Sequence, residues 1–274
     1  MKDIEATAGW TAAARAIESR RPDALFVDPW AADLAGEEGC SWAEARGPVG
    51  LAPMIVRTRY FDDFLLRATA TGGATQVVLL GAGLDTRALR LPWAPGTSVF
   101  EVDQPEVIHR KEAVLGGGTS PRCDRLVRLC TDMSGGSWPG QLVEVGLDPR
   151  ASAAWLAEGF LFYLGDDAIA ALLGRVSGLA AAGSVLGFDI PEPSVFTHPV
   201  TRPWIEMQAA AGAPWMGTID DPESYLAPLG WAASLSQCGA ADAHYGRWPL
   251  PVDSPAAKGL PQHRLVTARK RDLA

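Results

Sequence analysis

The sequence predicts an α/β protein with a doubly wound, mainly parallel sheet, and three observations support this fold class. The apolar run Val77–Leu80 ends abruptly in Gly-Ala-Gly, as a buried parallel strand does where it turns into a helix. A second short extended run, 98–102, follows and carries acidic residues at its end. From Gln76 onward, segments with strand and helix patterns alternate, which is typical of parallel sheets.

The expected elements follow this pattern along the chain. Residues 6–19 have apolar side chains at helical spacing, and a Pro/Gly-rich connection at 47–53 leads to a second helix at about 54–70. We expect strands near 76–80, 98–102, 125–130, 152–157 and 184–190, and helices near 86–91, 105–115, 138–145 and 166–180. Two later extended runs, about 231–236 and 263–268, are candidates for the last strands of the sheet.

Composition narrows the class of protein. The chain has 274 residues, of which 47% are hydrophobic and 20% charged, so it can bury a substantial core in one large or two small domains. The net charge is −8, and the longest basic cluster is Arg269-Lys270-Arg271. Nucleic acid is therefore not expected as a partner, because binding to phosphates needs concentrated positive charge.

The cysteines and the apolar segments indicate the cellular compartment of the protein. The four cysteines show no C-x-x-C spacing, which favours reduced thiols over disulfides or a metal site. The N-terminal residues contain no apolar core of an export signal, and the Ala/Leu-rich stretch 168–188 is interrupted by Gly174 and Arg175. We expect a cytoplasmic protein that neither spans nor binds a membrane.

The glycine turn and the acids after it predict a nucleoside cofactor. Asp103 lies 22 residues after Gly81, close to the spacing at which a carboxylate binds ribose hydroxyls in α/β folds. Thr86 stands where a dinucleotide site has its third glycine, so a pyrophosphate is disfavoured. No Gly-Lys-Ser/Thr follows, which excludes a P-loop. S-adenosylmethionine (SAM) fits best, with no metal required.

Five segments of the chain, taken in order, resemble segments of one known protein family. The sequence resembles the leucine carboxyl methyltransferase family, whose bacterial branch includes tetracenomycin-type polyketide O-methyltransferases, from about Ala12 to Ile190. The segments that carry it are Ser19–Phe26 with Asp28-Pro29, Val56–Asp63, Leu80–Arg87, Phe100–Pro105 and Ala157–Leu164.

The resemblance implies a class I SAM methyltransferase fold, with a Rossmann-like sheet of seven strands and an antiparallel final pair. We then expect one SAM-dependent methyltransferase domain over 1–274. Its parts would be an N-terminal helical cap (1–75), a cofactor-binding core (76–190), a substrate lid (191–220) and C-terminal strands that complete the sheet (221–274).

The SAM carboxylate is expected to bind an arginine, since a guanidinium binds carboxylates in bidentate fashion. Arg57 shares the apolar face of its helix with Phe61 and Phe64, whereas Arg59 points away and can pair with Asp62 or Asp63. Arg57 is therefore the predicted clamp, the alternative being a structural ion pair within the protein. Arg15 is a weaker candidate.

The other cofactor contacts follow from the turn and from the resemblance. The backbone atoms of Gly81, Ala82 and Gly83 should approach the methionyl group. Asp103 should accept hydrogen bonds from both ribose hydroxyls, the alternative being that it only caps the following helix. The resemblance implies that Asp132 and Met133 hold the adenine and that Glu158 lies by the methionyl end. For Glu158 the alternative is a buried ion pair.

The acceptor site is expected at the segment 191–220, which is rich in aromatic residues and methionine. It follows the fifth strand and should lie at the carboxyl edge of the sheet, where ligands bind. The alternatives are helix packing and a dimer contact. The residues predicted to bind substrate are Phe162, Phe196, Trp204 and Trp215.

Catalysis is expected to be a direct methyl displacement that depends mainly on orientation. A carboxylate acceptor needs no base, because it is ionised at neutral pH, whereas a phenol benefits from one. His198 in the lid is the first candidate base, and Tyr163 and His244 are weaker ones.

The predicted function is therefore SAM-dependent O-methylation of a carboxylate or hydroxyl of an aromatic or polyketide-type small molecule, with S-adenosylhomocysteine (SAH) as product. A homodimer is left open. Alternatives are N- or C-methylation on the same fold, methylation of a protein C-terminus, an NAD-dependent oxidoreductase and a non-catalytic SAM-binding subunit.

Overall fold

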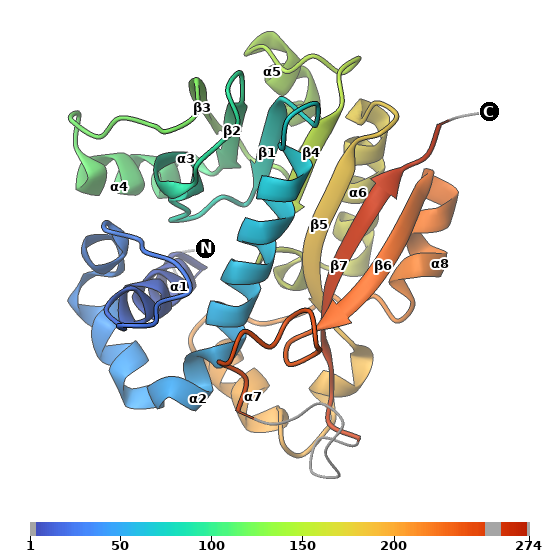
Figure 1. Cartoon of the computed structure of the whole chain (residues 1–274). Coiled ribbons are helices and arrows are strands. Elements are labelled where there is room, and N and C mark those ends of the chain that lie inside the picture. Colours follow the sequence, from blue (N-terminus) through green and yellow to red (C-terminus); the bar gives the residue numbers. More distant parts are fainter. Residues whose placement is uncertain (1–3, 250–258, 273–274) are drawn as a thin grey trace.

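A single seven-stranded sheet forms the centre of the molecule (Figure 1). The computed structural model describes residues 4–249 and 259–272. The strand order is β3-β2-β1-β4-β5-β7-β6, and only β7 is antiparallel, pairing with both β5 and β6. The strands are β1 (Gln76–Leu80), β2 (Ser98–Asp103), β3 (Arg125–Cys130), β4 (Ala153–Ala157), β5 (Val185–Pro191), β6 (Trp231–Gln237) and β7 (His263–Lys270).

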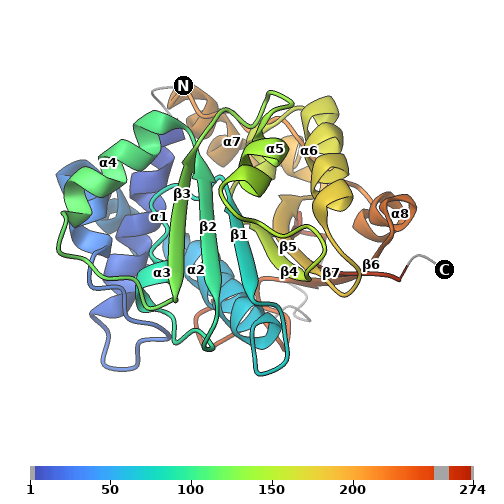
Figure 2. The same cartoon turned by 90° about the horizontal axis from the view of Figure 1, so that it is seen from above.

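Helices cover both faces of the sheet (Figure 2). The helices are α1 (Ile4–Ser19), α2 (Ala31–Ala68), α3 (Arg87–Arg90), α4 (Pro105–Leu115), α5 (Trp138–Glu144), α6 (Asp166–Leu179), α7 (Arg202–Ala210) and α8 (Pro222–Leu226), with 3₁₀ turns η1 (Leu161–Tyr163), η2 (Pro193–Phe196) and η3 (Ala227–Leu229). One core cluster joins the sheet to α5 and α6, and a second joins its other face to the C-terminal half of α2. The predicted fold class is thus confirmed, including the antiparallel last strands.

A third apolar cluster belongs to the N-terminal helices. Ala12 and Ala13 of α1 pack with Leu34 and Leu51 of α2 and with Leu84, which follows the β1 turn. The small alanines let the two helices approach closely, so α1 packs on α2 and both contact the loop that follows β1.

Helix α2 differs from the prediction, which had a connection at 47–53 and a helix only from about 54. The chain is helical from Ala31, with breaks at Gly36 (φ 66°) and Gly47 (φ 62°). Pro48 begins the last segment, where a proline is tolerated because the first N–H groups of a helix have no partner within it. The predicted connection at 47–53 is therefore reduced to a break at Gly47, and Pro48 begins the helical segment that follows.

Within the described residues, no helix is both long and apolar enough to cross a membrane. The reversal of strand order falls between β1 and β4, and in such sheets ligands bind at this point, beyond the carboxyl ends of the strands.

Candidate active site

The turn after β1 has the backbone conformation that its glycines predict. Gly81 has φ 61° and Gly83 has φ 50°, values in the left-handed region that favours glycine. A Cβ added to Gly81 would lie only 2.6 Å from Cγ of Phe160. On one side the turn therefore packs against Phe160 in the loop that follows β4, and on the other side it borders a cavity.

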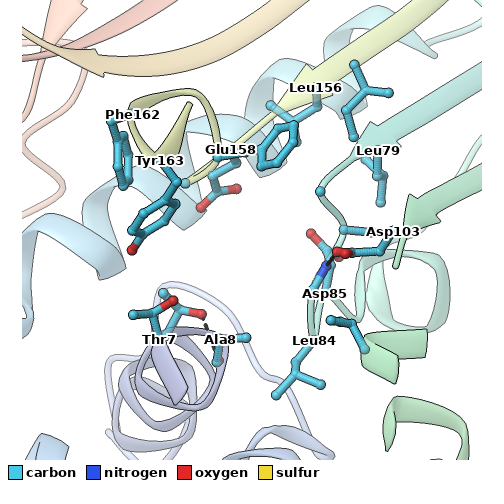
Figure 3. A pocket seen from close by; sticks show the side chains of 18 of the residues that line it. Thr7, Ala8, Leu79, Leu84, Asp85, Asp103, Leu156, Glu158, Phe162 and Tyr163 are labelled. Atoms are coloured by element: carbon cyan, nitrogen blue, oxygen red, sulfur yellow. Dashed lines mark hydrogen bonds between the residues drawn. The ribbon is translucent and has the colours of Figure 1, made fainter. Parts of the chain in front are cut away.

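Asp103, at the end of β2, lies directly beside this turn (Figure 3). Its Oδ2 accepts a hydrogen bond from the Gly83 N–H at 2.6 Å, and its Oδ1 accepts one from the Gln104 N–H at 2.7 Å. Burial raises the pKa of this carboxyl group above its usual value although both N–H groups act against the shift. The backbone therefore fixes the carboxylate in place, and its remaining lone pairs are available to hydroxyl donors.

A cavity of about 460 Å³ extends from the turn between the strand ends and α1. All eight residues predicted to bind the cofactor border it: Arg57, Gly81, Ala82, Gly83, Asp103, Asp132, Met133 and Glu158. Met133 is buried, whereas Asp132 is exposed and accepts hydrogen bonds from the N–H and the hydroxyl of Ser134 in the same loop. The fold thus gathers residues that lie up to about 100 positions apart in the chain onto one cavity wall, as parallel strands do.

Arg57 is held by two carboxylates of the protein. Its Nε donates to Glu158 Oε1 at 3.0 Å, and its Nη1 donates to Asp189 Oδ2 at 2.8 Å. Burial alone would lower the pKa of Arg57, but Asp189 and Glu158 outweigh it and raise the pKa. The structural ion pair that was the alternative to the clamp is therefore present, on a side chain that also lines the cavity.

Asp189 was not among the predicted site residues. It is completely buried at the middle of β5, accepts from the Gly159 N–H at 2.6 Å and lies 2.5 Å from Nε2 of His263. Although burial acts to raise it, the pKa of Asp189 falls to about 2 because of Arg57 and His263. The sequence did hold a signal, since a lone aspartate in an apolar strand needs a partner.

A second ion-pair group involves Arg87, which the motif Gly81–Arg87 contains but to which no role was assigned. Arg87 Nε donates to Asp62 at 2.7 Å, and its Nη2 lies 2.6 Å from Glu158 Oε2. It also binds Asp85, whose pKa is about 2, because Arg87 and other cations outweigh the opposing effect of burial. Glu158 therefore joins both groups at the cavity wall.

The other two arginines considered for the clamp have structural partners. Arg15 donates to Asp28 at 2.8 Å and to the Leu84 carbonyl at 2.6 Å, and so ties α1 to the loop after β1. Arg59 pairs with Asp63, as its helical spacing predicted, and also donates to the Leu25 carbonyl.

The predicted acceptor-side residues divide into two groups. Phe162, Tyr163, Trp204 and Trp215 border the cavity, and burial raises the pKa of the Tyr163 hydroxyl. Phe196 and His198 lie outside the residues that line it, and His198 instead accepts from the Val200 N–H at 3.2 Å. His244 likewise accepts from the Gly246 N–H.

The donor set of the cavity fits SAM. Asp103 offers a fixed carboxylate for two hydroxyls, and the backbone at Gly81 leaves room where a side chain would not fit. Glu158 lies by this turn and suits a cationic group, while the guanidinium of Arg57 suits a carboxylate.

Comparison with known proteins identifies the family. The model of the family "Leucine carboxyl methyltransferase" matches residues 8–177. A Streptomyces avermitilis protein named "putative S-adenosyl-L-methionine-dependent methyltransferase" is 36% identical, over 98% of this chain and 96% of its own length. A Streptomyces coelicolor protein with the same description is 37% identical over the same shares.

Two solved structures have the same fold. A DUF574 family protein from Streptomyces avermitilis superposes with a TM-score of 0.60 at 18% identity, covering 85% of this chain and 91% of that one. A protein from Thermobifida fusca, described as a "putative methyltransferase", also gives 0.60, at 20% identity and with 86% and 90% covered. The family model and the two Streptomyces relatives show that the chain belongs to the leucine carboxyl methyltransferase family and is a SAM-dependent methyltransferase.

Proposed function

We propose that this enzyme is an O-methyltransferase that transfers the methyl group of SAM to a carboxylate or hydroxyl of an aromatic or polyketide-type small molecule, as in the tetracenomycin-type branch of the family. One observation carries the proposal: Phe162, Trp204 and Trp215 border the same cavity as the residues predicted to hold the cofactor. Aromatic walls with few polar groups are typical of sites for apolar small molecules.

In this proposal, each part of the cavity wall binds one part of the cofactor. Asp103 accepts the ribose hydroxyls, and Asp132 and Met133 contact the adenine. Gly81, Ala82 and Gly83 lie along the methionyl group, with Glu158 and Arg57 at its polar end. When bound, SAM supplies an electrophilic methyl carbon on a sulfonium, and the protein contributes mainly by aligning the acceptor with it.

The described cavity favours an acceptor that needs no strong base. His198 and His244 do not border it, and the raised pKa of Tyr163 keeps this hydroxyl protonated at neutral pH. Tyr163 can therefore donate a hydrogen bond to an acceptor oxygen, but it does not supply a base. A carboxylate, already ionised at pH 7, fits this arrangement best.

The test is incubation with methyl-labelled SAM and a panel of aromatic acids, phenols and indoles, followed by mass spectrometry of the products. We expect labelled methyl esters, which mild alkali removes, or ethers, which it does not. The Asp103→Ala variant serves as the control for cofactor-dependent transfer. Transfer only to nitrogen or carbon, or to no member of the panel, would contradict the proposal.

A further inference from the structure

Six aromatic side chains form a continuous wall along the cavity, which we call the aromatic arc. Trp10 stacks on Trp42 with ring centroids 4.5 Å apart and planes 4° from parallel. Trp42 meets Trp204 at 6.3 Å, and Trp204 meets Trp215 at 6.5 Å, both edge to face. The arc continues from Trp215 to Phe162 at 4.3 Å and on to Tyr163 at 4.7 Å.

The aromatic arc is built from separate parts of the chain. Trp10 belongs to α1, Trp42 to α2 and Trp204 to α7, and the remaining rings follow β4 and α7. All six side chains border the cavity, and Figure 3 shows Tyr163 opposite Thr7 and Ala8 of α1. Aromatic side chains pack favourably against another ring system, either offset-stacked or edge to face.

The polar side chain of Gln208 lies beside Trp204 of this wall. Gln208 lies one helical turn after Trp204 on α7, so both project from the same face of that helix. Gln208 is only 3% exposed and borders the cavity. Its Oε1 is buried and accepts no hydrogen bond from any residue that the structure describes.

A buried amide oxygen without a donor is unfavourable, typically by about 1–3 kcal/mol. No side chain in the described part of the chain donates to this oxygen. Gln208 borders the cavity, so a molecule bound there can supply the donor. A site that places one such group in an apolar wall binds ligands with a matching donor and discriminates strongly against analogues that lack it.

We propose that Gln208 is the polar specificity determinant of the acceptor pocket, and that the substrate is a planar aromatic molecule with a ring N–H or phenolic O–H that donates to it. This inference rests on the proposed function, because it takes the aromatic arc as the acceptor site. The unpartnered atom is the amide oxygen, which accepts hydrogen bonds and does not donate them, so it selects the donor-bearing class.

The experiment measures binding of matched ligand pairs by quenching of tryptophan fluorescence, with SAH present to fill the cofactor site. The pairs are indole-3-carboxylate with its 1-methyl analogue, and 6-hydroxy-2-naphthoate with 6-methoxy-2-naphthoate. The wild-type protein should bind the donor member about 10-fold or more tightly. Gln208→Leu should lose that preference, and Gln208→Glu, which keeps an acceptor oxygen, should retain it.

Gln141 provides a matched control. It lies on α5, has a buried Oε1 that is likewise unpartnered among the described residues, and does not border the cavity. Gln141→Leu should keep the wild-type preference. Equal binding of both members of each pair, no binding of either pair, or a preference that survives in Gln208→Leu would each overturn the inference.

The two proposals fail in different ways. Donor preference without methyl transfer to any oxygen acceptor would remove the proposed function and leave the role of Gln208 in recognition. Methyl transfer to aromatic acids that is indifferent to both the ligand donor and Gln208 would support the proposed function and remove this inference.

Discussion

Asp103 owes its place in the site to two backbone hydrogen bonds, from Gly83 and Gln104. Removing the carboxylate in Asp103→Ala should weaken SAH binding by about 1.5–3 kcal/mol, the range for a lost charge-assisted hydrogen bond. Isothermal titration calorimetry measures this. Glu106→Gln, an exposed change on α4, is the control, and wild-type affinity in Asp103→Ala would refute the ribose assignment.

Arg57 should affect stability as well as cofactor binding. Substitution by Ala leaves Asp189, which is completely buried, without its guanidinium partner. Breaking a buried ion pair by removing one partner typically costs about 3–5 kcal/mol. We therefore expect Arg57→Ala to lower the free energy of unfolding on that scale, measured by urea denaturation without ligand.

Arg59→Ala provides the comparison, because its pair with Asp63 is partly exposed and exposed pairs contribute about 0–1 kcal/mol. Equal losses in the two variants would show that Arg57 does not stabilise the fold through Asp189.

At the residue scale, sequence reasoning found the side chains that lie near a recognisable motif. Asp103 could be predicted because the glycine turn sets the distance to the next strand end. Asp189 and Gln208 could not be placed, because their roles depend on which strand and helix pack beside them. Arg57 was placed on the correct face, but its partners come from β5 and the end of β4, which helix periodicity does not reveal.

The turn between β1 and α3 packs closely against Phe160, and substitutions at Gly81 test this contact. Gly81→Ala places a Cβ 2.6 Å from Phe160 Cγ in addition to the strain of a positive φ. At Gly96 the φ is also positive (84°), but a Cβ would meet nothing within 4 Å. Gly96→Ala thus isolates the backbone strain, which is typically about 1–2 kcal/mol.

We expect Gly81→Ala to lose at least about 1 kcal/mol more stability than Gly96→Ala, the scale for overpacking. It should also weaken SAH binding, because Phe160 and the turn both border the cavity. Thermal denaturation and calorimetry on both variants measure the difference. Equal stability of the two variants would mean that Phe160 moves freely, and that the turn is not held against it.

At the element scale, the strands and the helices α3 to α6 were predicted to within about two residues at each end. The predicted 125–130 and 76–80 agree with β3 and β1. Strand β1 is a short buried apolar run that ends at a glycine turn, whereas β3 is a partly exposed strand that contains Arg125 and Arg128. The first half of α2 was missed, since Gly36 and Gly47 interrupt its pattern with single residues in the left-handed region. Helix α7 was treated only as part of a lid segment, although its Trp204 and Gln208 share one face.

For the whole molecule, the sheet order brings distant residues together at one edge. Parallel strands β1, β2 and β4 end side by side, so the turn after Leu80, Asp103 and Glu158 meet at one cavity. This convergence was foreseeable from strand alternation. The cover from α1 and α2, which adds Trp10 and Trp42 to the cavity, was not, because contacts between helices depend on packing that a single sequence does not specify.

The same convergence concentrates buried carboxylates, which makes the stability of the molecule depend on acid pH. The pKa values of Asp189 and Asp85 are about 2 in the folded protein, against the ordinary 3.8. A depressed folded pKa contributes stability that is complete above the unfolded value and is lost as pH falls through the folded one. Asp103 acts in the opposite sense, because its pKa is raised.

Between about pH 5 and pH 2, protonation of Asp189 and of Asp85 should each lower the free energy of unfolding by about 2 kcal/mol. Urea denaturation over this range measures the total drop. In Asp189→Asn one titrating group is gone, so the drop should shrink by about 2 kcal/mol even though the starting stability is lower. Asp167→Asn, an exposed change at the start of α6, should keep the wild-type drop. If Asp189→Asn loses as much stability to acid as the wild type does, the ion pairs behind the cavity are not what couples this fold to pH.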